Sequence, residues 1–123
     1  MITLTFRAMS GESVTHVRGA YFRICADGTL RGPDNDVAAS YTDGQWQLGR
    51  GRHRVLECRE AVYLRVTTSD GQRECIGPYG DLKVTGGEIF SNDTYLGAHS
   101  AGESPLPKAG IWREIAVLSE RNQ

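Results

Sequence analysis

The sequence predicts an all-β chain of about twelve strands with a pseudo-threefold internal repeat. Short runs rich in β-branched and aromatic residues recur along its whole length. Glycine is frequent, at 15 of 123 residues, and falls mainly in the polar segments between those runs. Short apolar runs separated by glycine turns are typical of antiparallel β-structure and leave no room for a long helix.

Twelve runs are expected to be strands because each is short and bounded by turn residues. They cover residues 2–7, 14–18, 20–25, 37–41, 45–48, 54–58, 62–67, 73–76, 82–85, 88–90, 94–98 and 111–118. The last run is ambiguous, since Ile111, Ile115 and Leu118 also fit a helical period. Val117 and the bulky Trp112 favour a final strand.

Pairs of small residues separate many of these runs, and glycine suits tight hairpins because it tolerates positive φ. The pairs are Ser10-Gly11, Asp27-Gly28, Asp43-Gly44, Asp70-Gly71, Gly86-Gly87 and Ala101-Gly102. Two longer polar connections cover residues 33–36 and 100–110. Both are long enough to form a binding surface.

A similar unit occurs three times, opening on a tyrosine and returning to a bulky apolar residue. The openings are Tyr21-Phe22-Arg23-Ile24, Tyr63-Leu64-Arg65-Val66 and Tyr95-Leu96-Gly97-Ala98, and the returns are Trp46, Leu82 and Trp112. The openings begin 42 and 32 residues apart, and an internal repeat takes precedence in assigning a fold. Over residues 14–118 the chain resembles the β-trefoil superfamily, in particular its fascin-like and fibroblast-growth-factor-like branches.

The resemblance implies a barrel capped by three hairpins, with Phe22, Leu64 and Leu96 as equivalent core positions. It implies that Trp46 and Trp112 belong to the core, and that residues 2–13 lie outside the repeat and pair with the last strand. The Gln-x-Trp signature of ricin-like sugar-binding trefoils is absent. Growth-factor-like trefoils bind anionic sugars through basic loops. The resemblance therefore makes the basic residues of this chain candidates for an anion-binding site.

Those basic residues are most concentrated in Arg50-Gly51-Arg52-His53-Arg54. Arg50, Arg52 and Arg54 could converge on one sulfate, phosphate or carboxylate through guanidinium hydrogen bonds. The alternative is a solvated hairpin tip. A second candidate is Tyr79 with Asp81. A tyrosine exposed on a Pro-Gly loop can stack on the face of a sugar, while a neighbouring carboxylate accepts hydrogen bonds from the hydroxyl groups of the sugar.

His99 is the third candidate, beside Ser100 and upstream of Glu103 and Ser104. Catalysis there would need a positioned base and an oxyanion site, which a polar loop does not imply. We therefore predict no catalytic residue. With three dispersed histidines and no His-x-His, the sequence also predicts no metal and no cofactor.

Net charge and cysteine content narrow the class of protein. A formal net charge of −1 provides no field that would recruit nucleic acid or an anionic membrane. Cys25, Cys58 and Cys75 have no Cys-x-x-Cys spacing, and the first residues do not read as a signal peptide. These features favour a cytoplasmic, reduced protein with buried structural thiols.

The chain is thus expected to be a single domain over residues 1–123 that binds without catalysing a reaction. Its partner would be a protein or a carbohydrate, contacted through surface loops. The alternative is a small cupin-like β-barrel, an enzyme or a small-molecule carrier with a central pocket. Gly86-Gly87-Glu88-Ile89-Phe90 followed by His99 suggests that alternative.

Overall fold

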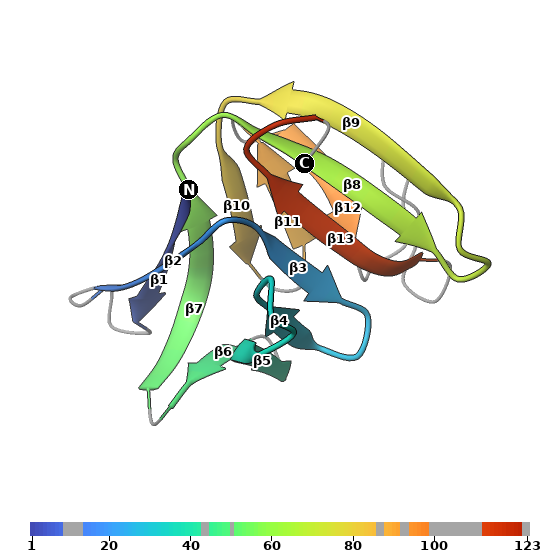
Figure 1. Cartoon of the computed structure of the whole chain (residues 1–123). Coiled ribbons are helices and arrows are strands. Elements are labelled where there is room, and N and C mark those ends of the chain that lie inside the picture. The colour runs from blue at the N-terminus through green and yellow to red at the C-terminus, as the bar shows by residue number, and fades with distance from the viewer. Residues whose placement is uncertain are drawn as a thin grey trace.

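The computed structural model describes residues 1–8, 14–42, 45–49, 51–85, 88–91, 94–98 and 112–121, and these residues form strands, turns and no helix (Figure 1). The prediction of an all-β chain is confirmed. The described residues also contain no helix of the length and apolarity that a membrane span requires.

Thirteen strands lie within the described residues. They are β1 (Ile2–Ala8), β2 (Val14–Gly19), β3 (Phe22–Cys25), β4 (Thr29–Arg31), β5 (Val37–Thr42), β6 (Gln45–Leu48), β7 (Gly51–Cys58), β8 (Val62–Thr68), β9 (Arg73–Tyr79), β10 (Leu82–Thr85), β11 (Glu88–Ser91), β12 (Thr94–Ala98) and β13 (Trp112–Leu118). The final run is a strand, as predicted. The sequence did not predict β4, which has only three residues and buries Leu30 alone.

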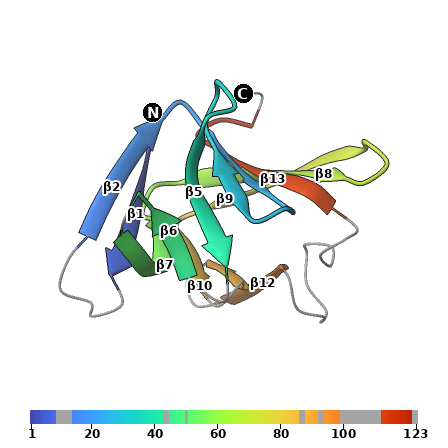
Figure 2. The ribbon, with the colours of Figure 1, turned by 90° about the horizontal axis from the view of Figure 1, so that it is seen from below.

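The strands form one hydrogen-bonded network with the order β12-β11-β10-β7-β6-β5-β4-β3-β13-β8-β9. Strand β7 is its branch point, since β6 pairs with its first half, β10 with its second half, and β1 with both β7 and β2. In Figure 2 the β8–β9 hairpin projects on the side of the molecule opposite β1 and β2.

Strand β13 joins two of the three repeat units. It pairs with β3 on one edge and with β8 on the other, and Val117 lies opposite both Phe22 and Leu64. The third repeat strand, β12, pairs instead with β11 at the far end of the network. The described pairings show neither a closed trefoil barrel nor a threefold repeat.

The expectation that residues 2–13 pair with the last strand is wrong for β1. That strand pairs with β2 and β7, while β3 and β8 take both edges of β13. An ion pair between Arg7 and Glu57 (2.9 Å, Nε to Oε1) supports the pairing with β7. The alternating residues Ile2, Leu4 and Phe6 are fully buried, so the apolar face of β1 extends the core.

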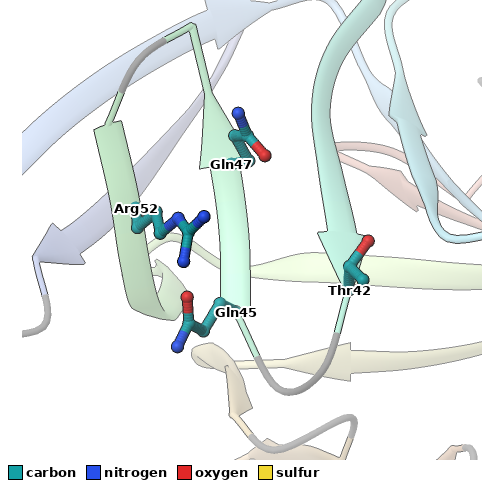
Figure 3. Close-up of a pocket in the computed structure, with 4 residues that line it drawn as sticks. All are labelled: Thr42, Gln45, Gln47 and Arg52. Carbon is teal, nitrogen blue, oxygen red and sulfur yellow. The ribbon is translucent and has the colours of Figure 1, made fainter.

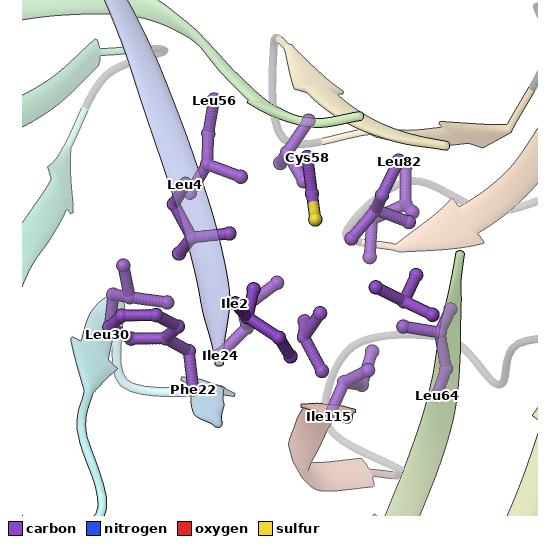
Figure 4. Packing of buried hydrophobic residues seen from close by; sticks show 14 of the residues in the cluster. Ile2, Leu4, Phe22, Ile24, Leu30, Leu56, Cys58, Leu64, Leu82 and Ile115 are labelled. Atoms are coloured by element: carbon purple, nitrogen blue, oxygen red, sulfur yellow. The ribbon is translucent and has the colours of Figure 1, made fainter. Parts of the chain in front are cut away.

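Apolar side chains from strands far apart in the sequence pack into one core, as Figure 4 shows for Ile2, Leu30, Leu56, Leu64 and Ile115. Burying each large aliphatic side chain stabilises the fold by about 1.5–3 kcal/mol. Trp46 and Trp112 are 2% and 1% exposed, which confirms that both belong to the core.

Two of the predicted glycine turns lie within the described residues, and both use positive φ. Gly28 has φ 90° after Asp27, and Gly71 has φ 91° after Asp70. In each turn the aspartate Oδ1 accepts a hydrogen bond from a threonine hydroxyl two residues away, Thr29 or Thr68. Side-chain and backbone chemistry therefore favour the same tight turns.

Candidate functional site

Strands β5, β6 and β7 carry two rows of side chains on opposite faces. Successive side chains of a strand point to opposite faces, so Gln45-Trp46-Gln47 places its tryptophan on one face and its two glutamines on the other. The cross-strand pairs continue the division: Tyr41 and His53 both lie opposite Trp46, whereas Arg52 lies opposite Gln47.

The inner row is aromatic and packed. The Trp46 ring lies edge-on to Phe6 and Tyr41, with centroid separations of 5.9 and 5.1 Å. The His53 imidazole, 6.0 Å from the Phe6 ring, is also buried. Edge-to-face aromatic pairs of this kind contribute about 0.5–1.5 kcal/mol beyond their buried area. This row packs the three strands against the core beneath the polar face.

The outer row lines a pocket of about 310 Å³ formed by Thr42, Gln45, Gln47 and Arg52 (Figure 3). Thr42 lies opposite Gln45 and Arg52 opposite Gln47, so the four side chains form two neighbouring cross-strand pairs. In Figure 3 the Arg52 guanidinium extends toward β6, between the two glutamines. Together these groups present a hydroxyl, two amides and one positive charge.

A β-bulge at Arg54 divides the predicted basic segment. Between Arg7 and Ala8 the partner on β7 moves from Val55 to His53, so Arg54 is an extra residue. Such a bulge changes which residues point inward, and it is why His53 and Leu56 are both buried although three positions apart. His53 is therefore not part of a basic surface.

The structure places Arg52 and Arg54 on the exposed surface of β7, and Arg50 lies outside the described residues. Arg52 lines the polar pocket, whereas Arg54 is not among the described residues that line it. Of the two described arginines of the expected cluster, Arg52 therefore lies at the pocket, beside Gln45 and Gln47, and Arg54 does not.

The structure places Tyr79 and Asp81, the second pair of candidate residues, at half-buried positions. Tyr79 ends strand β9 and packs against the core, and burial raises the pKa of its phenol. Asp81 accepts a hydrogen bond from the Ser91 hydroxyl at 3.3 Å. The Tyr79 ring is thus partly buried against the core and partly exposed. His99 lies outside the described residues.

The three cysteines are free thiols in different surroundings. Cys58 is buried, and desolvation raises the pKa of its thiol, as expected for a structural cysteine. Cys25 and Cys75 are half-buried, which departs from the expectation that all three are buried. Within the described ranges, no three His, Cys, Asp or Glu side chains gather in a way that could hold a metal ion.

Sequence reasoning missed Thr42, Gln45 and Gln47 as site residues. The signal that would have found the glutamines is their alternation around Trp46, because a buried tryptophan in a strand turns both neighbours to the opposite face. The position of Thr42 depends on how β5 pairs with β6, which alternation does not reveal.

Comparison with known proteins found no matching family model, no matching curated protein and no matching solved structure. The functional conclusion therefore rests on the chemistry of the site.

Proposed function

We propose that this protein is a non-enzymatic binding module for an acidic carbohydrate. One observation carries the proposal: the outer face of β5–β7 forms a pocket of about 310 Å³ whose described lining is entirely polar. That volume lies at the lower end of the range of about 300–1,000 Å³ that is usual for small-molecule sites. The pocket lies on a sheet whose inner face is packed with aromatic rings.

The lining groups match the chemistry of a sugar acid or a sulfated sugar. Arg52 can donate two parallel hydrogen bonds to a carboxylate or sulfate. Gln45 and Gln47 each carry a donor and an acceptor group, and Thr42 carries a hydroxyl, so neighbouring sugar hydroxyls can be bonded in either direction. No proton-transfer group lies among these four residues, which supports binding without catalysis.

The packed interior also supports a surface binder over a carrier with a central pocket. Fourteen of the core side chains appear in Figure 4, converging from β1, β3, β4, β7, β8, β10 and β13 on the middle of the molecule. Protein interiors formed by such buried side chains are generally close-packed, which favours a ligand site on the surface.

The β-trefoil is the fold that we propose behind this function. Its support is the shared register of Phe22 and Leu64, both opposite Val117 of β13. Its test is an experimental structure: Leu96 should occupy a third core position related to the other two by a threefold axis. A different environment for Leu96 would overturn the trefoil and leave the pocket proposal unaffected.

The function is tested by isothermal titration with uronic-acid and sulfated oligosaccharides chosen from a glycan array. Arg52→Gln should weaken binding by about 10- to 100-fold, because a hydrogen bond to a charged group contributes about 1.5–3 kcal/mol. Gln45→Ala should weaken it by about three- to tenfold, the loss expected for neutral hydrogen bonds.

Arg54→Gln is the matched control, since it removes the same charge from the same strand without changing the pocket. Equal losses from Arg52→Gln and Arg54→Gln would show that a diffuse basic surface binds the ligand. Failure of every acidic glycan to bind would overturn the carbohydrate assignment and favour a protein partner at this face.

A further inference from the structure

A second cluster of charged residues lies at the junction of β3, β4 and β13, away from the polar pocket. Arg23, Arg31 and Arg113 line a shallow depression of about 460 Å³, together with the carboxylates Asp27 and Glu114 and with Cys25, Ala26 and Asn35. The arginines come from three different strands, so no local pattern in the sequence joins them. The depression shares no described lining residue with the pocket of β5–β7.

Two of these arginines are held side by side at an electrostatic cost. Arg23 and Arg31 lie directly opposite one another on the antiparallel strands β3 and β4. Like charges at such positions destabilise a strand pair. A site that places them there gains from any anion that neutralises both.

Asn35 positions both guanidinium groups. Its side-chain Oδ1 accepts a hydrogen bond from Arg23 Nη2 at 2.6 Å, and its main-chain oxygen accepts one from Arg31 Nη1 at 3.0 Å. The residue adopts φ 64°, in the left-handed region, which lets its two oxygens serve different partners. The 33–36 connection thus orients the arginine pair.

Arg113 is a lining residue of the same depression and lies at a β-bulge, with its Nη2 atom 3.9 Å from the position a Cβ would take at Gly71. Along β13 the pairing with β8 moves from Trp112 to Glu114 while β8 advances by one residue, so Arg113 is the extra residue. Its main-chain oxygen accepts a hydrogen bond from Ala26 N at 2.9 Å, which ties the bulge to the end of β3. Bulges commonly redirect a side chain toward a binding site.

The resident carboxylates leave donors available. Glu114 is 3.6 Å from Arg23 and Asp27 is 4.0 Å from Arg31, both beyond a good hydrogen bond. Among the described residues, Arg113 has no ion-pair partner. Each guanidinium carries five N–H donors, so the cluster has more donors than its own acceptors use.

We propose that this depression binds the phosphate group of a small molecule. A planar carboxylate presents two oxygens and suits one guanidinium, whereas a phosphate presents oxygens on several sides and carries up to two charges. The facing guanidiniums of Arg23 and Arg31, with Arg113 in the lining of the same depression, offer the tetrahedral anion donors from more than one direction. The volume exceeds that of inorganic phosphate, which leaves space for the organic part of the ligand.

The direct test is a titration of the ¹⁵N-labelled full chain with inorganic phosphate at constant ionic strength, followed by NMR. Amide signals of Cys25, Ala26, Gly32 and Asn35 should shift and saturate. Arg113→Gln should weaken the affinity by about tenfold or more, the loss typical of a charge-assisted bond. Arg18→Gln, an exposed arginine on β2, should leave the affinity unchanged.

Asn35→Gly tests the positioning role specifically. Glycine accepts the same positive φ, so the connection can keep its shape while Arg23 loses its side-chain acceptor. We expect weaker phosphate binding with an unchanged melting temperature of the free protein within about 2 °C, which corresponds to a small loss of stability. If Asn35→Gly bound phosphate with wild-type affinity, the Asn35 side chain would have no role in positioning the arginines.

Cys25 provides an internal reporter, because trypsin places each thiol in a separate peptide: residues 24–31 for Cys25, 55–59 for Cys58 and 74–83 for Cys75. Phosphate should slow the alkylation of Cys25 by iodoacetamide and leave that of the half-buried Cys75 unchanged. Anionic iodoacetate should favour Cys25 over Cys75 more than neutral iodoacetamide does, and Arg113→Gln should reduce that preference.

The competing anions decide the ligand class. Saturation by phosphate and by phosphoserine, with acetate much weaker, supports the proposal. Equal affinity for acetate would make the depression a carboxylate site, and the absence of any saturable shift with phosphate would overturn it. Neither result bears on glycan binding at β5–β7, which Arg52→Gln tests separately.

Discussion

Arg23 and Arg31 face each other across strands β3 and β4, and each donates a hydrogen bond to Asn35. A like-charge pair in this position persists when the surrounding structure holds it, and here a connection of a few residues does so. The pair makes the electrostatics of the β3–β4–β13 junction sensitive to single changes of charge.

Glu114→Gln should tighten phosphate binding. Glu114 lies 3.6 Å from Arg23 and competes with an incoming anion, so its neutralisation raises the positive charge of the depression. We expect a several-fold gain in affinity by NMR titration and a stability change within about 1 kcal/mol, as for a partly exposed ion pair. Glu74→Gln, on exposed β9, is the control. Weaker binding in Glu114→Gln would show that Glu114 orients Arg23 for the ligand.

Thr29→Val and Thr68→Val should each raise the pKa of one aspartate. The Thr29 hydroxyl holds the pKa of Asp27 below its ordinary value of 3.8, and the Thr68 hydroxyl does the same for Asp70. Carboxyl ¹³C shifts measured against pH should show each variant moving its own aspartate alone. The two variants are therefore controls for one another.

The sign of the accompanying stability change follows from linkage. A carboxyl group whose pKa is lowered by folding contributes stability above its unfolded pKa, and that contribution disappears as the pH falls through the folded pKa. As the pH falls below about 3.8, the free energy of unfolding should consequently decrease less in either valine variant than in the parent protein. An unchanged acid profile would show that the backbone donors alone stabilise the two turns.

Phe22→Ala and Leu64→Ala should each destabilise the protein by about 2–5 kcal/mol in urea unfolding, because both leave a cavity beside Val117. The two side chains are 2% and 0% exposed. Val37→Ala, at a position that is 50% exposed, should cost much less. A loss below about 0.5 kcal/mol in either core variant would contradict the packing beside β13.

Gly28→Ala should destabilise the fold by more than Gly49→Ala. Both glycines have positive φ, so alanine is strained at either position. At Gly28 an added Cβ would also lie 2.8 Å from the main-chain oxygen of Tyr41, whereas at Gly49 it would have no described atom within 4 Å. The φ strain alone costs about 1 kcal/mol or more, and thermal unfolding should show the additional loss at Gly28. Equal losses would mean that Tyr41 moves away freely.

Local patterns in the sequence were sufficient for twelve of the strands and for the two glycine turns, and the internal repeat indicated the burial of Trp46 and Trp112. These features depend on alternation and on turn chemistry, which act over a few residues. The same alternation assigns Gln45 and Gln47 to the face opposite Trp46. Strand β4 escaped prediction because three residues are too few to show a period.

Only the tertiary structure decided which strands meet. It paired β1 with β7 instead of β13, buried His53 through the bulge at Arg54, and placed Arg52 but not Arg54 at the polar pocket. It also gathered Arg23, Arg31 and Arg113 from strands that span about ninety residues of sequence. The physical reason is that pairing between distant strands depends on how the whole set of apolar faces is buried together, and no short stretch of sequence contains that information.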